Sequence, residues 1–318
     1  MRLCLMVEGQ EGVTWDEWTA LAAACERSGL DGLFRSDHYF SVIGRRDRVS
    51  HDALATLAAL AARTERIRLG TLVSPVTFRH PSVLAKTVAT IDLVSGGRVE
   101  LGLGAGWNER EHAAYGFPFP PLGERMSMLE EQVEIVHRLW TEDTVTFEGR
   151  HYRLDDCPAL PKPLQQPRPP LILGGNAGPR AVALAVRFAD EYNTLLASVD
   201  DCRQRRATLA GACEAAGRDP ATLPLSLMAT CAVGEDRADV LRRVRAILDV
   251  WGAGDDDPEA VLAERGHRWI AGTPAEVVER LGQLAEAGVT RVYLQHLVPA
   301  DTEMVELVGE AVLPELSG

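Results

Sequence analysis

Short, nearly continuous apolar runs alternate along the chain with longer stretches in which apolar residues recur every three or four positions. The first pattern is typical of buried parallel strands, and the second is typical of amphipathic helices. The apolar runs are RLCLMVEG, LDGLFRSD, RIRLGTLVSP, RVELGLGAGW, PLILGG, EYNTLLAS, PLSLMATCAVG and RVYLQHLV. The alternation therefore predicts eight strands joined by helices.

Residues at the ends of the predicted helices support this division. Side chains that can cap a helix N-terminus stand at Thr14, Thr273 and Asp301. Glycines that can close a helix follow the last apolar turns at Gly29, Gly96, Gly97, Gly217 and Gly288. Such elements form either a closed barrel or an open doubly wound sheet. Because no G-x-G-x-x-G turn follows the first strand, we predict an α/β fold, a (β/α)8 TIM barrel, with residues 1–318 as a single domain.

Three segments interrupt the regular alternation, at residues 107–122, 141–170 and 252–274. The first two lie around the fourth and fifth strands, and the third precedes the eighth. In the second segment, TVTFEG and RHYRLDD alternate around Gly149, which predicts a β-hairpin. Insertions of this length usually shape an active-site mouth or a subunit contact.

Composition and charge narrow the classes of function. The chain has a formal net charge of −13 and no long Lys/Arg run, so nucleic acid and anionic membranes are not expected partners. The start, MRLCLMVEGQEG, resembles neither a signal peptide nor a transmembrane segment, and no later stretch reaches spanning length, which predicts a cytoplasmic protein. The six cysteines lack a C-x-x-C pair and no H-E-x-x-H spacing occurs, so we expect reduced thiols and no metal site.

Small and polar residues follow the predicted strands, where a (β/α)8 barrel carries its active site. They are Glu8; Ser36, Asp37 and His38; Ser74; Gly104, Gly106 and Asn108; Gly174, Gly175 and Asn176; Asn193 and Thr194; Thr230; Gln295 and His296. Asp37 and His38 are candidate catalytic residues, because an imidazole exchanges protons near neutral pH and a carboxylate can orient its ring or bind a cofactor. The alternative is a carboxylate that caps the next helix beside a solvated histidine.

The segment LILGGNAGPR has the features of a phosphate site. Two glycines leave the strand, and Pro179 stands where a helix would begin. Backbone N–H groups there could face an anion, with Arg180 nearby. The residues that would supply them are Gly175, Asn176, Ala177 and Gly178. The alternative is a tight turn that requires glycine.

The third and fourth strands also end in candidate binding residues. In GLGAGWNERE, glycines up to Gly106 leave room for a flat ring system, with Trp107 as a wall and Asn108 as a polar contact. Ser74 precedes Pro75 where the chain turns sharply. The alternatives are close packing of the fourth strand and loop geometry set by two prolines after the third.

Together, several motifs resemble the bacterial luciferase-like monooxygenase superfamily, and more narrowly its branch of coenzyme F420-dependent oxidoreductases. They are RSDHYF, SPVTFRHPSVLAKTVATIDLVSGGRVELGLGAGWNEREHAAYG, GERMSMLEEQVEIVHRLW, FEGRHYRL, PKPLQQPRPPLILGG and FADEYN. The resemblance runs over nearly the whole chain, and the segment 74–106 is specific enough that chance does not explain it. It implies a (β/α)8 barrel that binds a flavin or 5-deazaflavin at the carboxyl ends of the strands, acts on a small molecule and forms a homodimer.

The resemblance also assigns roles to residues. In F420-using relatives a histidine after the second strand lies over the reacting ring, which corresponds to His38, with Asp37 beside it. A bulge or non-prolyl cis peptide that backs the ring corresponds to Val73 and Ser74. The remaining correspondences are polar or glycine positions after the fourth and fifth strands: Asn108, Gly174 and Gly175.

One position departs from the family pattern. Some sugar-phosphate dehydrogenase relatives have an acidic residue where this chain has Trp107, and neither Glu109 nor Glu111 is equivalent by spacing. The proton-transfer role of that acid therefore does not carry over. A sugar-phosphate substrate is accordingly not expected.

The resemblance implies hydride transfer between the C5 atom of F420 and a C=C, C=N or C=O group or an alcohol, with His38 supplying or removing the proton. Basic residues that could meet the acidic tail of F420 are Arg35, Arg45, Arg46 and Arg48. For the last three the alternative is a solvated surface loop. One alternative is an FMN-dependent monooxygenase that uses reduced flavin and oxygen. Another is a non-catalytic cofactor-binding protein.

Overall fold

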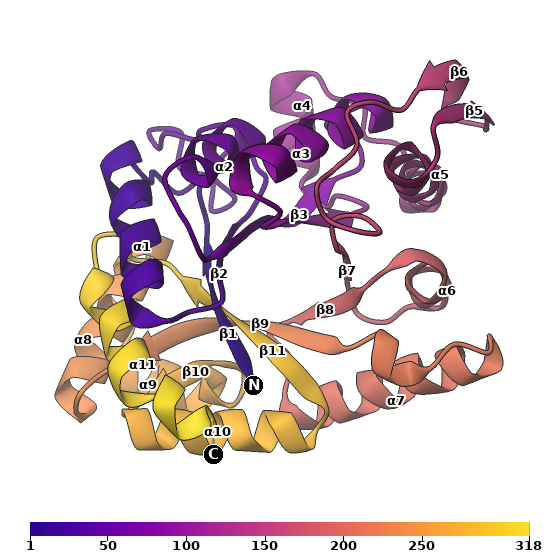
Figure 1. Ribbon diagram of the computed structural model, residues 1–318. Helices are drawn as coiled ribbons and strands as arrows, with labels where there is room; N and C mark the ends of the chain where they lie inside the picture. Colours follow the sequence, from indigo (N-terminus) through magenta and orange to yellow (C-terminus); the bar gives the residue numbers. More distant parts are fainter. Residues whose placement is uncertain (318) are drawn as a thin grey trace.

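Eight parallel strands close into a barrel in the computed structural model, which describes residues 1–317 (Figure 1). They are β1 (Arg2–Val7), β2 (Gly32–Arg35), β3 (Arg68–Pro75), β4 (Val99–Gly104), β7 (Leu171–Gly174), β8 (Glu191–Leu195), β9 (Leu225–Val233) and β11 (Val289–His296). Their order follows the sequence, and β11 pairs with β1 to complete the ring. The predicted TIM barrel is confirmed.

Helices surround the barrel and connect its strands (Figure 1). They are α1 (Trp15–Ser28), α2 (Ala53–Ala61), α3 (Pro81–Ser95), α4 (Glu109–Tyr115), α5 (Leu122–Thr141), α6 (Pro179–Phe188), α7 (Val199–Ala215), α8 (Arg237–Trp251), α9 (Pro258–Arg265), α10 (Pro274–Glu286) and α11 (Thr302–Ala311). Short 3-10 turns cover Pro220–Thr222, Gly266–Arg268 and Leu313–Ser317.

Local signals place the helix ends where the sequence predicted them. Thr14 and Thr273 form capping boxes with the glutamates three residues later, and Asp301 accepts a hydrogen bond from the amide of Met304 at 3.1 Å. Gly29 closes α1 with φ of 78°, a conformation that is inexpensive for glycine. These helix ends are therefore set by contacts within a few residues.

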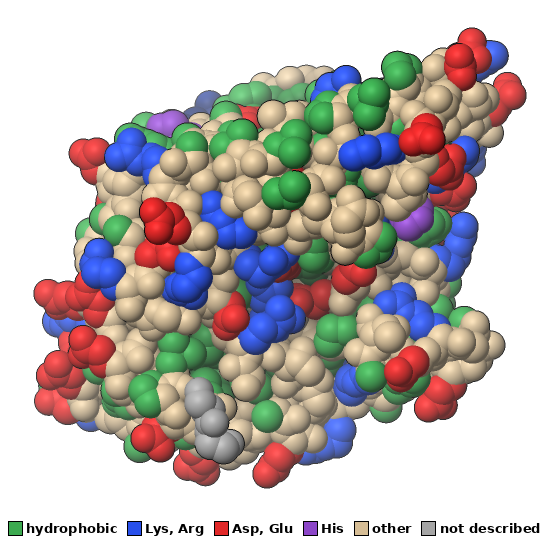
Figure 2. Space-filling view, viewed as in Figure 1, with side chains coloured by type: hydrophobic (Ala, Val, Ile, Leu, Met, Phe, Trp, Pro, Cys, Tyr) green, Lys and Arg blue, Asp and Glu red, His purple; other side chains and the backbone are tan. Residues whose placement is uncertain are grey.

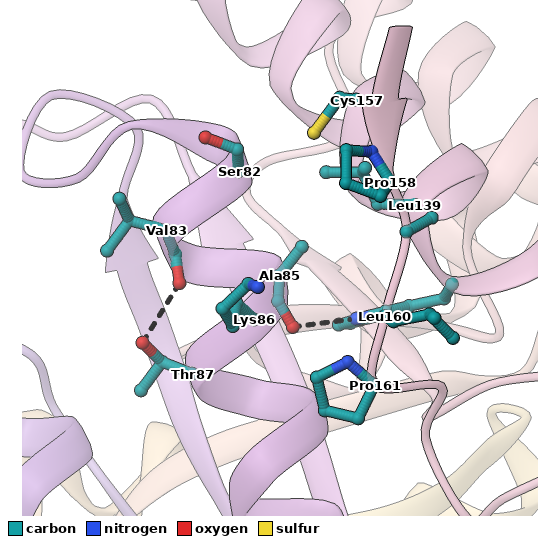
Figure 3. A pocket seen from close by; sticks show the side chains of 12 residues that line it. Ser82, Val83, Ala85, Lys86, Thr87, Leu139, Cys157, Pro158, Leu160 and Pro161 are labelled. Carbon is teal, nitrogen blue, oxygen red and sulfur yellow. Dashed lines mark hydrogen bonds between the residues drawn. The ribbon is translucent and has the colours of Figure 1, made fainter. Parts of the chain in front are cut away.

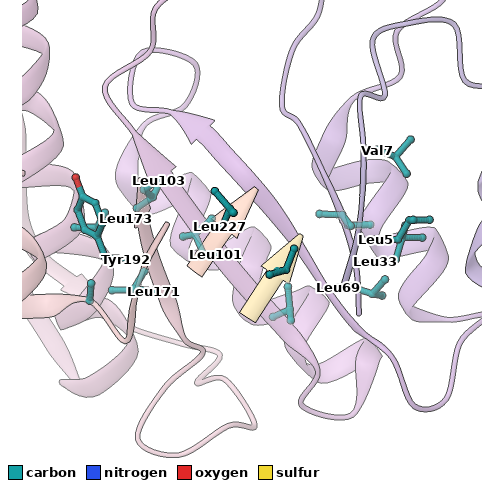
Figure 4. Close-up of a cluster of buried hydrophobic side chains, with 14 of the residues drawn as sticks. Leu5, Val7, Leu33, Leu69, Leu101, Leu103, Leu171, Leu173, Tyr192 and Leu227 are labelled. Atoms are coloured by element: carbon teal, nitrogen blue, oxygen red, sulfur yellow. The ribbon is translucent and has the colours of Figure 1, made fainter. Parts of the chain in front are cut away.

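Outward-facing strand residues form the main hydrophobic core between the barrel and its helices (Figure 4). Leucines at successive strands, including Leu5, Leu33, Leu69 and Leu101, are at most 1% exposed. Burying one such side chain contributes about 2 kcal/mol. This layer accounts for the apolar runs, because strands covered by helices on one side and by the barrel interior on the other have no solvent face.

The barrel interior is itself packed. Inward-facing side chains form a second cluster that includes Met6, Phe34, Ile172 and Tyr293. The ring of Phe34 lies against β3 only because position 70 is glycine, since a Cβ on Gly70 would lie 2.4 Å from that ring. Packed side chains therefore fill the barrel interior below its carboxyl-terminal mouth.

Charged groups fill the amino-terminal end of the interior, a feature that the sequence analysis missed. Arg291 donates to Glu100 at 2.7 Å and to Glu191 at 3.2 Å, and the hydroxyl of Tyr293 donates to Glu191 at 2.6 Å. Arg68 also contacts Glu100. The first four side chains are at most 5% exposed, so they form a closed buried network.

The predicted insertions contain additional elements. The hairpin is confirmed as antiparallel strands β5 (Thr144–Glu148) and β6 (Arg153–Pro158), closed by a 2.9 Å hydrogen bond from the Gly149 amide to the Tyr152 carbonyl. A short strand that was not predicted, β10 (Ile270–Gly272), extends the sheet beside β9. Three residues are too few to produce a recognisable hydrophobic period.

Surface and thiol features complete the fold. Among residues 1–317, no helix is both long and apolar enough to cross a membrane. Within the same range all six cysteines are unpaired, and five of them are buried, as expected. On the face shown in Figure 2, acidic and basic side chains are interspersed, with a small group of basic side chains in a hollow near the centre of the view.

Candidate active site

The turn after β2 brings His38 against α4. Nδ1 of His38 lies 2.7 Å from Oε2 of Glu111, whose side chain has no exposed surface. The imidazole is 11% exposed, and its edge meets the ring of Trp107 with the centroids 5.6 Å apart. Within residues 1–317, Nε2 of His38 makes no hydrogen bond. One nitrogen is therefore held by the protein and the other is left for a ligand.

Opposing influences act on the protonation of His38. Burial disfavours the imidazolium and acts to lower its pKa. The hydrogen bond to Glu111 and the charge of that carboxylate act in the opposite direction, with smaller contributions from Glu8 and Asp37, and the pKa of His38 is raised overall. The structure thus favours the protonated imidazole more than water does.

Asp37 is engaged in a buried ion pair. It is 1% exposed, it contacts the guanidinium of Arg79, and it accepts a hydrogen bond from the hydroxyl of Ser74 at 2.6 Å. Arg79 also donates to Asp52 at 2.8 Å and to the hydroxyl of Tyr39 at 2.9 Å. These contacts tie the turn after β2 to the end of β3, so Asp37 fixes the position of the segment that carries His38.

The end of β3 has the backbone irregularity that the resemblance implied. The Leu72–Val73 peptide is cis, and the pairing of β3 with β4 shifts between Thr71 and Ser74. Val73 packs closely over two glycines of β4. Cβ atoms built on Gly102 and Gly104 would lie only 2.9 and 2.7 Å from its methyl groups, so the packing requires glycine at both positions. Val73 therefore forms an apolar surface at the top of the barrel interior.

The glycines after β4 and β7 leave the mouth open. Gly106 has φ of 77°, and Trp107 beside it is 65% exposed. The predicted polar contact Asn108 caps α4 by accepting a hydrogen bond from the amide of Glu111 at 3.3 Å. Gly174 also faces Val73, with 3.6 Å between a Cβ built there and the valine methyl group.

The turn before α6 is the segment for which the sequence predicts an anion site. The amide of Gly175 donates to the Asn193 carbonyl and that of Ala177 to the Tyr192 hydroxyl, both at 3.0 Å. The amides of Asn176 and Gly178 make no hydrogen bond within residues 1–317. Arg180 points to α5 instead, where it donates to Glu130 at 2.8 and 3.0 Å. Two of the four amides and Arg180 are therefore bound within the protein, which leaves the amides of Asn176 and Gly178.

The four arginines expected near an acidic tail are mostly engaged. Arg35 is fully buried and donates to Thr56 and to backbone carbonyls, Arg45 pairs with Asp47, and Arg48 pairs with Glu11. Arg46 has neither an ion pair nor a side-chain hydrogen bond within residues 1–317. It is the member of this group that is available to an anionic ligand.

A chain of hydrogen bonds crosses the mouth between strand ends far apart in sequence. Ser36 donates to Gln10 at 2.5 Å, and Gln10 donates to Glu8 at 2.9 Å. Gln295 donates to the other oxygen of Glu8 at 2.6 Å, and Thr230 donates to Gln295 at 2.8 Å. These strand-end residues are thus brought together, and Gln10 is a member that the sequence analysis missed.

Strand alternation separates other pairs of predicted residues. Gln295 points into the barrel, whereas the neighbouring His296 is 2% exposed and lies on the helix side. Likewise, Asn193 donates to its register partner Ser226 on the neighbouring strand β9, while Thr194 contacts Arg205 of α7. His296 and Thr194 therefore do not face the mouth.

A cavity of about 330 Å³ lies away from these residues, between α3 and the segment after β6 (Figure 3). Val83 and Lys86 line it from α3, and Leu160 and Pro161 face them. Its lining holds a single charged side chain, Lys86, and none of the strand-end residues. The cavity is therefore separate from the candidate active site.

Known proteins resemble this chain in sequence over much of its length. A family model described as luciferase-like monooxygenase matches residues 3–291. The chain is 32% identical to an F420-dependent glucose-6-phosphate dehydrogenase of Nakamurella multipartita, over 94% of this chain and 92% of that protein. It is also 32% identical to an FMNH2-dependent dimethylsulfone monooxygenase of Pseudomonas putida, over 59% of this chain and 52% of that protein.

The fold is shared with solved structures. The structure of an F420-dependent secondary alcohol dehydrogenase in complex with an F420–acetone adduct superposes with a TM-score of 0.83. The alignment covers 99% of this chain and 98% of that one at 21% sequence identity.

Proposed function

This chain belongs to the luciferase-like monooxygenase family, and from that premise we propose that it is a coenzyme F420-dependent oxidoreductase that exchanges a hydride with a small organic substrate. Membership of this family makes the protein an oxidoreductase. What we propose is its cofactor and the type of reaction. The observation that carries it is His38, whose Nδ1 is held by Glu111 while Nε2 is left without a partner among the described residues. Similarity to an F420-dependent dehydrogenase over most of the chain supports the choice of cofactor.

The residues at the mouth suit a flat ring system. Gly104 and Gly174 carry no side chains, and Val73 between them offers an apolar surface. A Cβ on Gly104 would lie 2.7 Å from Val73, so this surface has no space for a larger residue. We propose that a deazaflavin ring rests on Val73, with His38 and Trp107 at its side. The amides of Asn176 and Gly178 and the side chain of Arg46 are the proposed contacts for its anionic groups.

His38 is the proposed proton donor. Bound reduced F420 would supply a hydride to the substrate. Reduction of a C=C, C=N or C=O bond also consumes one proton, which Nε2 of His38 can deliver because its pKa is raised. Asp37 acts through position, since its ion pair with Arg79 fixes the turn that carries His38.

The second candidate is an FMN-dependent monooxygenase. The similarity to an FMNH2-dependent monooxygenase over 59% of the chain favours it, and the same apolar surface would accept an isoalloxazine ring. Reduced flavin reacts with oxygen, so this reading predicts consumption of O2. The two candidates therefore differ in cofactor and in oxidant.

Cofactor titration distinguishes them. The purified apoprotein would be titrated with F420 and separately with FMN, following cofactor fluorescence. We expect tight F420 binding and weak FMN binding. Tight binding of FMN alone would replace the proposal by the monooxygenase. Binding of neither cofactor would contradict both.

We further propose that the substrate is not a sugar phosphate. Trp107 stands exposed beside His38, and the nearby carboxylate of Glu111 is fully buried and bound to that histidine. No carboxylate therefore stands at position 107, where some sugar-phosphate dehydrogenase relatives carry an acidic residue. Glucose 6-phosphate should not reduce F420 in the presence of the enzyme, and turnover with it would overturn this part of the proposal.

We also propose that the protein is a homodimer. Large apolar side chains that are at least 45% exposed gather along α3 and the segment after β6: Val83, Leu93, Val94, Leu160 and Leu164. A second copy of the chain would bury them, and the lining of the adjacent cavity is apolar apart from Lys86 and a few small polar groups. Sedimentation equilibrium should give twice the mass of the chain, and Val94→Arg should give monomers. A wild-type monomer would contradict this proposal.

A further inference from the structure

The carboxylate of Glu111 is bound on both oxygens. Oε2 lies 2.7 Å from Nδ1 of His38, while Oε1 accepts the amides of Tyr39 and Phe40 at 2.5 and 3.1 Å. All of these partners follow β2, and Glu111 itself lies 73 residues from His38 in the chain. One buried carboxylate thus holds both the backbone of the turn after β2 and the imidazole that it carries.

The first turn of α4 places that carboxylate. Asn108 caps the helix at the Glu111 amide, and its carbonyl lies 2.7 Å from Nδ1 of His112. Nε2 of His112 lies 2.5 Å from the hydroxyl of Thr77 after β3. Consecutive residues of α4 therefore contact the turns after β2 and β3, and Glu111 has little freedom to move.

We propose that Glu111 is a positioning residue, which keeps the proton on Nδ1 of His38 and directs Nε2 into the mouth of the barrel. Nε2 is then the ring nitrogen that gains and loses a proton. The imidazolium is favoured because it faces a buried carboxylate. The assignment rests on the proposed proton-donor role of His38 for its functional meaning. Its structural content, the tautomer of His38, is independent of any cofactor.

The charged groups around His38 support a donor role. Glu111 faces it from α4, Glu8 from the end of β1, and Asp37 from its own turn, and all three favour the imidazolium. Asp37 is largely neutralised by Arg79. Glu111 is the one that touches the ring, so it should account for most of the electrostatic preference.

The substitution Glu111→Gln tests the proposal with a geometric consequence. An amide has one acceptor oxygen, and two partly buried backbone donors, Tyr39 and Phe40, compete for it against a single imidazole. Leaving those two donors unsatisfied is the costlier choice, so the oxygen should stay with them. The NH2 group of the substituted side chain would then face Nδ1, and the neutral ring should carry its proton on Nε2 instead.

The experiment is 15N NMR of histidine-labelled apoprotein across a pH titration. Wild-type His38 should titrate above an ordinary histidine, and its neutral form should be the Nδ1–H tautomer. In Glu111→Gln the midpoint should fall by about one to three pH units and the tautomer should reverse. Glu109→Gln, which removes the same charge from an exposed position on the same helix, should leave both unchanged.

The wild-type protein alone can overturn the proposal, so the test does not depend on a folded variant. A wild-type neutral form with the proton on Nε2 would do so, as would a Glu111→Gln protein with the wild-type midpoint and tautomer. Because no cofactor is present, these results are separate from the F420 titration. In an active holoenzyme, the basic limb of the kcat profile should shift to lower pH in Glu111→Gln, with little change in KM.

Discussion

The two ends of the barrel interior both bury charged side chains, but they leave different groups free. At the amino-terminal end, Arg291 and the carboxylates of Glu100 and Glu191 satisfy one another, with side chains at most 5% exposed. At the carboxyl end, Glu111 is equally buried, yet its partner His38 is 11% exposed and keeps one nitrogen unbound within residues 1–317.

This difference separates a structural network from a candidate site. In a closed network every buried charge is paired within the protein, and no ligand can reach it. Removing one partner leaves an uncompensated buried charge, so the network has a structural role. An open pair has a group oriented by the protein and directed to accessible space. Burial of charge by itself therefore does not indicate function, whereas a buried charge that orients an accessible proton donor does.

Removing Nε2 of His38 should abolish the function of the His38–Glu111 pair while its structure is retained. Asn at position 38 can still donate to Glu111 in place of Nδ1 but has no counterpart of Nε2. We expect His38→Asn to lower kcat by about 10²- to 10⁴-fold, the usual contribution of a general acid. Its urea midpoint should remain close to that of the wild type. Unchanged turnover would show that His38 is not the proton donor.

Replacing the central cation should break the closed network. Arg291→Met leaves Glu100 and Glu191 buried without their main partner, which should lower the free energy of unfolding by about 3–5 kcal/mol. Guanidinium denaturation of the apoprotein measures it. The control is Arg2→Met, because Arg2 is 48% exposed and lies 3.6 Å from Glu191, so at most about 1 kcal/mol should be lost. Equal losses would contradict the distinction.

A second buried histidine sharpens the contrast with His38. At His296, burial outweighs the opposing charge of Asp301 and lowers the pKa to about 4. Its unfolded form protonates near pH 6.5, so protons favour the unfolded state between these values. Stability should therefore fall by up to about 3 kcal/mol as the pH drops from about 6.5 to 4. His296→Gln should flatten this part of the stability curve, whereas exposed His267→Gln should retain the wild-type slope.

The substitution with the smallest expected effect tests the apolar surface of Val73 at the carboxyl end of the barrel. Gly104→Ala would place a methyl group 2.7 Å from Val73, and the resulting overpacking should cost about 1–3 kcal/mol and weaken cofactor binding. Gly211→Ala on α7 meets nothing within 4 Å and should instead stabilise the protein by about 0.5–1 kcal/mol. Equal cofactor affinity in both variants would argue that the ring does not approach Val73.

Much of the fold follows from short-range signals in the sequence. The barrel strands are readable because helices cover one side and a packed interior covers the other, which makes each run apolar throughout. Helix ends at Thr14, Thr273 and Gly29 depend on contacts within four residues, so they too are visible in the sequence. β10 has three residues and no such signal.

The partners within the candidate site are not readable in the same way. Glu111 meets His38 across 73 positions, and Gln10 meets Ser36 across 26. Strand alternation would have separated Gln295 from His296 if the register of β11 had been known. Asp37 was predicted as a catalytic and cofactor-binding residue. Its ion pair with Arg79 was not foreseeable, because Arg79 lies 42 positions away in the turn after β3.

The exposure of Trp107 has an optical consequence. Trp18, Trp140 and Trp269 are at most 3% exposed and Trp15 is 37% exposed, whereas Trp107 is 65% exposed beside the imidazole of His38. Its indole should emit at longer wavelengths than the buried ones and be the first to be quenched by iodide. A ligand that covers the barrel mouth should abolish that quenching, so the protein contains its own reporter of occupancy.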